Sequence, residues 1–197
     1  MDAIEALMTR TTVGQLVEPA PDGAVLQAIL QAGLRAPDHG RLRPWKFMVV
    51  RGEARKALGE VLAGSLRHRM GGAADAQVQR ERQKPLRAPL IVVVAALVSE
   101  GSSIPTIEQV LSAGAAAENI LVAAHALGYA AAWKTGDAAY DADVKAAFGL
   151  RPQDAIVGFL YLGSPAKPAA RPAPVDVAAH VQEWRGPAEI PGASRIP

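Results

Sequence analysis

The chain contains no cysteine, which excludes disulfide bonds, thiolate metal ligands and a thiol nucleophile. Several catalytic signatures are also missing, namely H-E-x-x-H, G-x-S-x-G, the G-x-x-x-x-G-K phosphate loop, and G-x-G-x-x-G after a strand. The four histidines lie too far apart in the sequence for metal-ligand spacing. These absences argue against zinc hydrolases, serine hydrolases, kinase-type NTPases and dinucleotide-binding folds of the glycine-rich type, and we expect no metal site.

Long hydrophobic runs are missing as well. The longest uninterrupted apolar run, 90–98, falls well short of the roughly 20 residues that a membrane-spanning helix needs. The first five residues are acidic where a signal peptide would be basic. We therefore expect a cytoplasmic protein without a membrane partner.

Length and composition indicate one domain followed by a tail. Half of the 197 residues are hydrophobic, enough for a sizeable core, and the net charge of +2 is too small to indicate a nucleic-acid partner by itself. We expect a single domain over 1–164. Four prolines then fall within ten residues, so 165–197 should be an extended arm that packs on a partner subunit. From Gly186 onward we expect poor order.

Hydrophobic periodicity predicts one sheet with helices around it. Helices are expected over 2–9, from 22 to about 34, and over 53–69, 74–83, 106–127 and 141–149, with Asp22 and Asp141 as N-caps and Gly128 as a C-terminal cap. Strands are expected over 45–50, 90–98, 129–135 and 155–162. The strand over 90–98 is apolar on both faces, so it should lie centrally. The class is α/β or α+β.

Three polar clusters interrupt this apolar pattern. The first is Arg10-Thr11-Thr12, just after the opening helix. A guanidinium followed by two hydroxyls and free backbone amides suits a phosphate group. The alternative is a solvated helix end, where the helix dipole favours an arginine.

The second cluster is Arg35-Ala36-Pro37-Asp38-His39, which leads to Arg43-Pro44-Trp45-Lys46-Phe47. It is either a functional loop stiffened by two prolines or a surface turn with a core tryptophan and a solvated histidine. The third is Trp133-Lys134-Thr135-Gly136, where an apolar strand ends in a cation, a hydroxyl and a glycine. Functional groups often lie at such strand ends, although a solvated lysine is the alternative.

Taken in order, these clusters resemble the FMN-dependent NAD(P)H nitroreductase family, and in particular its compact bacterial branch. The resemblance also includes the long helix from Ser112 to Gly128 and the segment 157–163, and it covers about residues 2–164. It implies an α+β fold with a central, mostly antiparallel sheet flanked by helices. It further implies an intertwined homodimer with FMN sites at the interface.

The same resemblance assigns site residues. It implies that Arg10, Thr11 and Thr12 hold the FMN phosphate, that Arg35 and His39 reach the flavin from the partner subunit, and that Trp133, Lys134 and Thr135 line the flavin. It also links the helix turn from Ala123 to Gly128 with the nicotinamide nucleotide; its residues are Ala123, Ala124, His125, Ala126, Leu127 and Gly128.

The sequence departs from the family pattern twice. Thr11 stands where the family usually has a second arginine, so one phosphate-binding cation is missing. Arg43 stands where an amide side chain usually precedes the Pro-Trp pair, which affects the expected hydrogen bonds to the edge of the flavin ring.

The activity that this resemblance implies is hydride transfer from NAD(P)H through FMN to a nitroaromatic, quinone or similar small acceptor, by a ping-pong mechanism. FMN carries the chemistry, so no protein acid or base is required. Lys134 or Arg35 could stabilise the anionic reduced ring, and His39 could donate to flavin or substrate or be structural.

Three other functions stay open at this point. One is a flavin-dependent dehydrogenase or dehalogenase of the same fold, and another is a non-catalytic member that has lost FMN. The third is a binding protein that uses the basic stretch Arg80 to Lys84 with Arg87 on nucleic acid. A solvated helix face explains that stretch better, because Glu81 interrupts it and it contains no aromatic residue.

Overall fold

The computed structural model describes residues 1–184 and 186. The helices are α1 (Ala3–Thr9), α2 (Gly23–Gly33), α3 (Ala54–Met70), α4 (Asp75–Gln83), α5 (Thr106–Ala126) and α6 (Ala142–Ala147). The strands are β1 (Leu16–Val17), β2 (Trp45–Arg51), β3 (Leu90–Ala96), β4 (Ala130–Lys134) and β5 (Ala155–Pro165). The expected poor order from Gly186 onward concerns residues that, apart from Gly186 itself, lie outside this description.

All five strands form one antiparallel sheet in which β5 is the organising strand. β3 pairs with one side of β5 and with β2, while β4 and then β1 pair with the other side of β5. Every residue of β3 is buried, which confirms the central strand predicted from its apolar run. The fold is α+β, as the resemblance implied. β1 was not predicted, because a strand of two residues has no periodicity to read.

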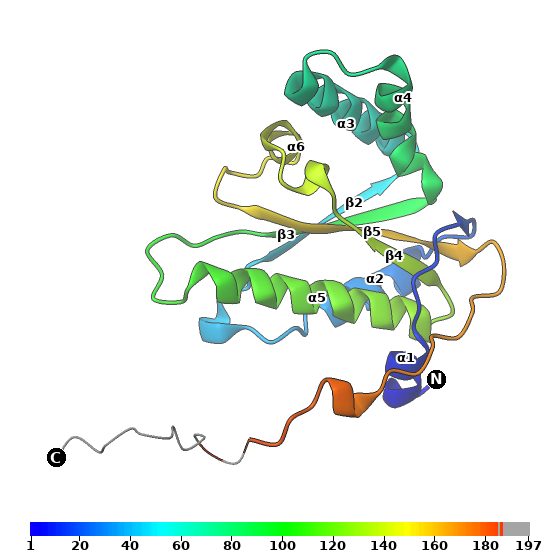
Figure 1. Cartoon of the computed structure of the whole chain (residues 1–197), viewed down its shortest axis with the longest axis vertical. Coiled ribbons are helices and arrows are strands. Elements are labelled where there is room, and N and C mark those ends of the chain that lie inside the picture. Colours follow the sequence, from blue (N-terminus) through cyan, green and yellow to red (C-terminus); the bar gives the residue numbers. More distant parts are fainter. Residues whose placement is uncertain (185, 187–197) are drawn as a thin grey trace, which may run out of the picture.

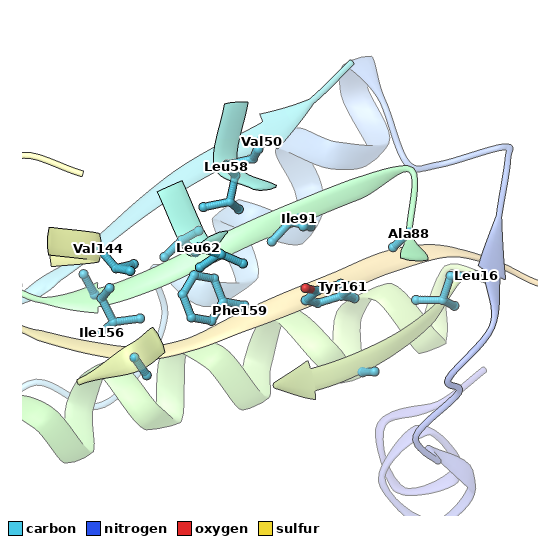
Figure 2. Packing of buried hydrophobic residues seen from close by; sticks show 14 of the residues in the cluster. Leu16, Val50, Leu58, Leu62, Ala88, Ile91, Val144, Ile156, Phe159 and Tyr161 are labelled. Atoms are coloured by element: carbon cyan, nitrogen blue, oxygen red, sulfur yellow. The ribbon is translucent and has the colours of Figure 1, made fainter. Parts of the chain in front are cut away.

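The helices cover the sheet in two layers (Figure 1). α2 and α5 pack on one face, where Ile29 and Ile120 are fully buried against β3 and β5. α3 and α6 pack on the other face, through Leu58, Leu62 and Val144, and α4 packs against α3. Figure 2 shows this second core, with Phe159 and Tyr161 pointing from β5 toward the α3 side.

The helix ends follow the local sequence in most places. Asp141 caps α6 by accepting from the backbone N–H groups of Asp143 and Val144. At the end of α5, the N–H of Gly128 bonds to the carbonyl of His125 and that of Tyr129 bonds to Ala124, with Gly128 at φ 87°. This is the pattern of a glycine-terminated helix, as predicted. Asp22 occupies the N-cap position of α2, but its side chain makes no capping bond, so that part of the prediction is wrong.

The arm beyond β5 lies on the outside of the domain. Residues 166–184 are exposed throughout and include a short 3-10 turn, Val177–Ala179. Within the part of the chain that the structure describes, no helix is long and apolar enough to cross a membrane.

Candidate active site

The open edge of β4 meets the segment that follows α1. Thr12 forms a parallel bridge with Ala131, and the N–H of Val13 donates to the carbonyl of Ala131 at 3.0 Å. The carbonyl of Ala131 therefore points away from β5. Because backbone groups alternate along a strand, the N–H and C=O of Trp133 point to the same open edge. The first and third polar clusters are thus neighbours in the fold.

A cavity of about 440 Å³ opens beside this edge on the α3 side of the sheet. Its floor comes from alternate residues of β4 and β5, and its walls come from α3, from the segment after α4 and from the loops around Gly14 and Gly136. Ala132 lies opposite Tyr161 in the strand register, and its small side chain leaves space above the sheet. The lining residues are Gly14, Leu16, Leu62, Lys84, Arg87, Ala132, Lys134, Thr135, Gly136, Ala138, Phe159 and Tyr161.

The charged residues that line the cavity are all cations: Lys84, Arg87 and Lys134. Lys84 is paired with Glu81 at 2.5 Å. For Arg87 and Lys134, the described residues provide no ion-pair partner. A concave site with one sign of charge raises the local concentration of ligands of the opposite sign, so the cavity favours anions.

Tyr161 lies on the floor of this cavity and is only 8% exposed. Burial raises the pKa of Tyr161 to about 12, with Arg87 acting in the opposite direction and Glu81 adding to the increase. The phenol is therefore neutral near pH 7 and keeps its proton.

A second hollow, of about 320 Å³, also has Gly14 in its lining and lies over Thr11 and Thr12 of the first polar cluster. It is lined by Thr11, Thr12 and Gln15 and by the start of the arm, including Lys167. Arg10 lies next to this hollow, where its Nε is 3.2 Å from Oε1 of Glu118 on α5. Both side chains of this pair are partly exposed, so Arg10 can exchange Glu118 for a phosphate at little cost.

Known proteins share this sequence and fold. The model of the nitroreductase family matches residues 7–164. The chain belongs to the nitroreductase family. It is 45% identical over 166 residues to the Escherichia coli (strain K12) protein named "Putative NAD(P)H nitroreductase YdjA", with 84% of this chain and 89% of that protein covered.

Solved structures agree on the fold. The Bacillus cereus nitroreductase-like family protein has a TM-score of 0.78 at 23% identity, covering 94% of this chain and 97% of that chain. A structure from Desulfovibrio desulfuricans, described as a "putative nitroreductase in complex with fmn", has a TM-score of 0.72 at 22% identity. That match covers 95% of this chain and 99% of the other.

Trp133 differs from its two neighbours in the third cluster. Lys134 and Thr135 line the cavity, whereas the indole of Trp133 lies on the opposite face of the sheet, where its Nε1 donates to the carbonyl of Val157 at 3.1 Å. Of Trp133, only the main chain faces the site edge. The indole of Trp133 therefore does not line this cavity, and the assignment of Trp133 to the flavin stays a prediction.

Gly158 provides the space for that indole, since a Cβ at position 158 would collide with the Trp133 ring. Gly158→Ala is expected to destabilise the protein by about 2–3 kcal/mol through overpacking and loss of the Trp133–Val157 hydrogen bond. Urea unfolding monitored by fluorescence measures this change. Gly64→Ala in α3, where a Cβ meets nothing within 4 Å, is the control and should be neutral or stabilising. Equal behaviour of the two variants would contradict this packing.

Arg35 and His39 lie elsewhere. Their loop is anchored to the N-terminal part of α5, since Ser112 donates to the carbonyl of Pro37 at 2.6 Å and His39 Nδ1 lies 2.6 Å from Oε2 of Glu108. The helix α1, which ends just before Arg10, lies near the C-terminal end of α5 (Figure 1), and Arg10 pairs with Glu118 of that helix. Glu108 and Glu118, which pair with His39 and Arg10, are separated by roughly 15 Å along the helix at 1.5 Å per residue. A single chain therefore does not bring the second polar cluster, with Arg35 and His39, next to the first, with Arg10 and Thr12.

The turn from Ala123 to Gly128 borders the site without entering the cavity. His125 and Gly128 line a hollow of about 210 Å³ with Arg10 and Thr11, and Nε2 of His125 lies 2.9 Å from the hydroxyl of Thr9. Ala124 is fully buried and Ala123 faces α1. A helix C-terminus carries partial negative charge, which does not attract nucleotide phosphates. The nicotinamide assignment stays a prediction.

Sequence reasoning missed Gly14, Lys84, Arg87, Tyr161 and Lys167. Lys84 and Arg87 stand in a basic stretch interpreted as a solvated helix face, of which Arg82 in fact pairs with Glu60 at 2.6 Å. Gly14 and Lys167 follow features that were recognised, namely the Arg10–Thr12 cluster and the last strand. Lys167 lies just after the last strand, and its position could have indicated that it replaces the arginine that is missing at position 11.

Proposed function

We propose that this protein is an FMN-dependent oxidoreductase that takes hydride from NAD(P)H and reduces small acceptors such as nitroaromatics or quinones. The observation that carries the proposal is that Gly14 lines two neighbouring hollows, one over Thr11 and Thr12 and the other lined by cations at the open edge of β4. This arrangement suits a ligand with a phosphate at one end and a ring that becomes negatively charged at the other. The relatives named NAD(P)H nitroreductase and the FMN-bound structure support it.

The residues present fit FMN. Arg10, Thr11 and Thr12 would hold the phosphate, with Lys167 as the second cation that Thr11 does not provide. The main chain of Trp133, with Lys134 and Thr135, would position the ring at the strand edge. FMN, when bound, supplies the hydride chemistry.

The protein's own contribution is electrostatic. Lys134, Arg87 and Lys84 are placed to stabilise negative charge in a site partly removed from water, where such interactions are stronger than in bulk solvent. Tyr161 supplies a neutral O–H group on the same floor. Because FMN would carry the chemistry, no general base is required of the protein, which agrees with a lining set that contains no histidine or carboxylate.

A second copy of the chain would complete the site. The loop that carries Arg35 and His39 is anchored near the start of α5, at Glu108, whereas Arg10 pairs with Glu118 ten positions further along, so Arg35 and His39 would reach the FMN of a partner. Exposed apolar side chains accompany this arrangement: Ile4 and Met8 on α1 and Ile107 and Leu111 on α5 are 62–71% exposed. On the arm, Val175 and Trp184 are also exposed, which fits an arm that packs on the partner. We propose an intertwined homodimer on this basis.

Initial-rate kinetics with NADPH and a quinone, each varied at fixed levels of the other, test the activity. A ping-pong mechanism gives parallel double-reciprocal lines, because NADP⁺ would leave the site before the acceptor binds. Intersecting lines would require a ternary complex and contradict the mechanism. If the FMN-bound protein shows no turnover, a non-catalytic member of the family is favoured. If it turns over only halogenated compounds, or only compounds that it dehydrogenates, a dehalogenase or a dehydrogenase of the same fold is favoured.

A further inference from the structure

The phenol of Tyr161 opens to the cavity and has no hydrogen-bond partner within the described part of the chain. Only 8% of the residue is exposed and it lines the cavity, yet its oxygen is not among the buried polar atoms that lack a partner, so the hydroxyl is the end that stays accessible from the cavity. Such a hydroxyl is hydrated until a ligand displaces the water, and a ligand oxygen that accepts the same hydrogen bond keeps that interaction. For Tyr161, the acceptor is therefore whatever occupies the cavity.

The position of Tyr161 does not call for a hydroxyl on packing grounds. It lies in register between Ile91 of β3 and Ala132 of β4, and the neighbouring large residue on the same face of β5 is Phe159 (Figure 2). A phenylalanine would fill the same space. The hydroxyl is therefore available for a ligand rather than required by the core.

The groups around the hydroxyl define which ligand chemistry fits. Lys84 and Arg87 line the same cavity; against the larger increase from burial, Arg87 lowers the pKa of Tyr161, and Glu81, which pairs with Lys84, raises it. A neutral O–H donor beside cations is the arrangement that stabilises an oxygen with negative charge. At about 440 Å³ the cavity is also far larger than a single water requires.

We propose that Tyr161, with Arg87 and Lys84, forms an oxyanion pocket that donates a hydrogen bond to a negatively charged oxygen of the ligand in this cavity. The proposal rests on the proposed function, which offers two sources for that oxygen. One is the carbonyl oxygen of the FMN ring when FMN is reduced, and the other is an acidic group on the oxidant, such as a carboxylate.

Tyr161→Phe tests the proposal against Tyr140→Phe, which changes an exposed tyrosine outside the cavity. The thermal midpoint of apo Tyr161→Phe should equal or exceed that of the wild type, because no hydrogen bond within the protein is lost. Binding constants for FMN are then measured in air and under dithionite, and KM is compared for 4-nitrobenzoate and nitrobenzene. Tyr140→Phe should leave every value unchanged.

If the flavin is the source, Tyr161→Phe should weaken binding of reduced FMN about ten- to a hundred-fold more than binding of oxidised FMN. If the oxidant is the source, KM for 4-nitrobenzoate should rise by a similar factor while KM for nitrobenzene does not. Either result supports the oxyanion pocket. Equal values for wild type and Tyr161→Phe in both assays would overturn it and leave an ordered water as the partner of the hydroxyl.

Failure of the proposed function gives a different result. If the wild-type protein binds no FMN in either redox state, the flavin enzyme itself is refuted. The oxyanion pocket is then tested by measuring the binding of 4-nitrobenzoate to the apoprotein through quenching of tryptophan fluorescence. Binding that is lost in Tyr161→Phe supports the pocket, and binding that is absent from the wild type or unaffected by the change overturns it.

Discussion

Replacing Arg10 with alanine should weaken FMN binding about ten- to a hundred-fold, because a charge-assisted contact to a phosphate contributes about 1.5–3 kcal/mol. Arg10 is held by Glu118 at 3.2 Å and shares a hollow with Thr11, which also lines the hollow over Thr12. Thr11 supplies no charge of its own, so the loss of Arg10 leaves Lys167 as the remaining cation of the lining. Isothermal titration of apoprotein with FMN measures the effect.

Glu118→Gln is the matched control for Arg10. It removes the other half of the ion pair and leaves the guanidinium free for phosphate. If Arg10 binds FMN, Glu118→Gln should bind FMN as tightly as the wild type or more tightly, because the phosphate no longer competes with a carboxylate. Equal weakening in both variants would show that Arg10 acts only through its pair with Glu118 on α5.

The second large effect concerns the carboxylate of Asp154, which joins the ends of β3 and β5. Asp154 is 2% exposed, and its two oxygens accept from the N–H of Val98 at 2.9 Å, from the N–H of Arg151 at 2.8 Å and from the Arg151 guanidinium at 2.7 Å. Asp154→Ala leaves these donors unsatisfied and is expected to cost about 2–4 kcal/mol of unfolding free energy. The cost is held down because the Arg151 side chain is 54% exposed and can be hydrated.

The pH dependence of stability provides a second measurement for Asp154. Burial alone would raise the pKa of Asp154, but the hydrogen bonds from Arg151 and from the backbone of Arg151 and Val98 lower that pKa overall. A carboxylate with a lowered pKa stabilises the fold above its ordinary value of 3.8, and this stabilisation is lost as the pH falls through the folded pKa.

Urea unfolding at pH 7 and at decreasing pH checks both statements. The difference between wild type and Asp154→Ala should be full at pH 7 and shrink below pH 3.8. The exposed residue Asp75 serves as the control, because Asp75→Ala should change stability by less than about 0.5 kcal/mol. A difference that stays constant into acid would show that the carboxylate charge of Asp154 is not responsible.

How far the sequence predicts this molecule depends on the range of the interactions involved. The uniformly apolar stretch of β3 identified a central strand, and Asp141 and Gly128 marked helix ends, because these features depend on residues a few positions apart. The strand that ends in Lys134 was predicted, and Lys134 and the hydroxyl of Thr135 were predicted to be functional groups at its end. Which face each side chain takes follows from pairing with β5, so the packing of the Trp133 indole on the face away from the cavity could not be predicted from the sequence.

The site residues show the same division. Arg10–Thr12 and Lys134 were recognised as polar groups in apolar surroundings. Lys84 and Arg87 were not, because a lysine or arginine after a polar helix has the same local pattern whether it faces water or a cavity. Only the packing of α3 and α4 over the sheet places them at the site. Similarly, the separation of His39 from Arg10 along α5 is a property of the fold, and it is what makes a second subunit necessary in our proposal.

An absorbance spectrum of the purified protein tests the central claim most directly. It would be recorded alone, after addition of FMN and removal of the unbound excess, and then after addition of NADPH without oxygen. The account predicts protein-bound flavin bands that bleach with NADPH and return when a quinone or nitroaromatic is added. Protein that retains no flavin after incubation with FMN, or bound flavin that neither NADPH nor NADH reduces, would contradict it.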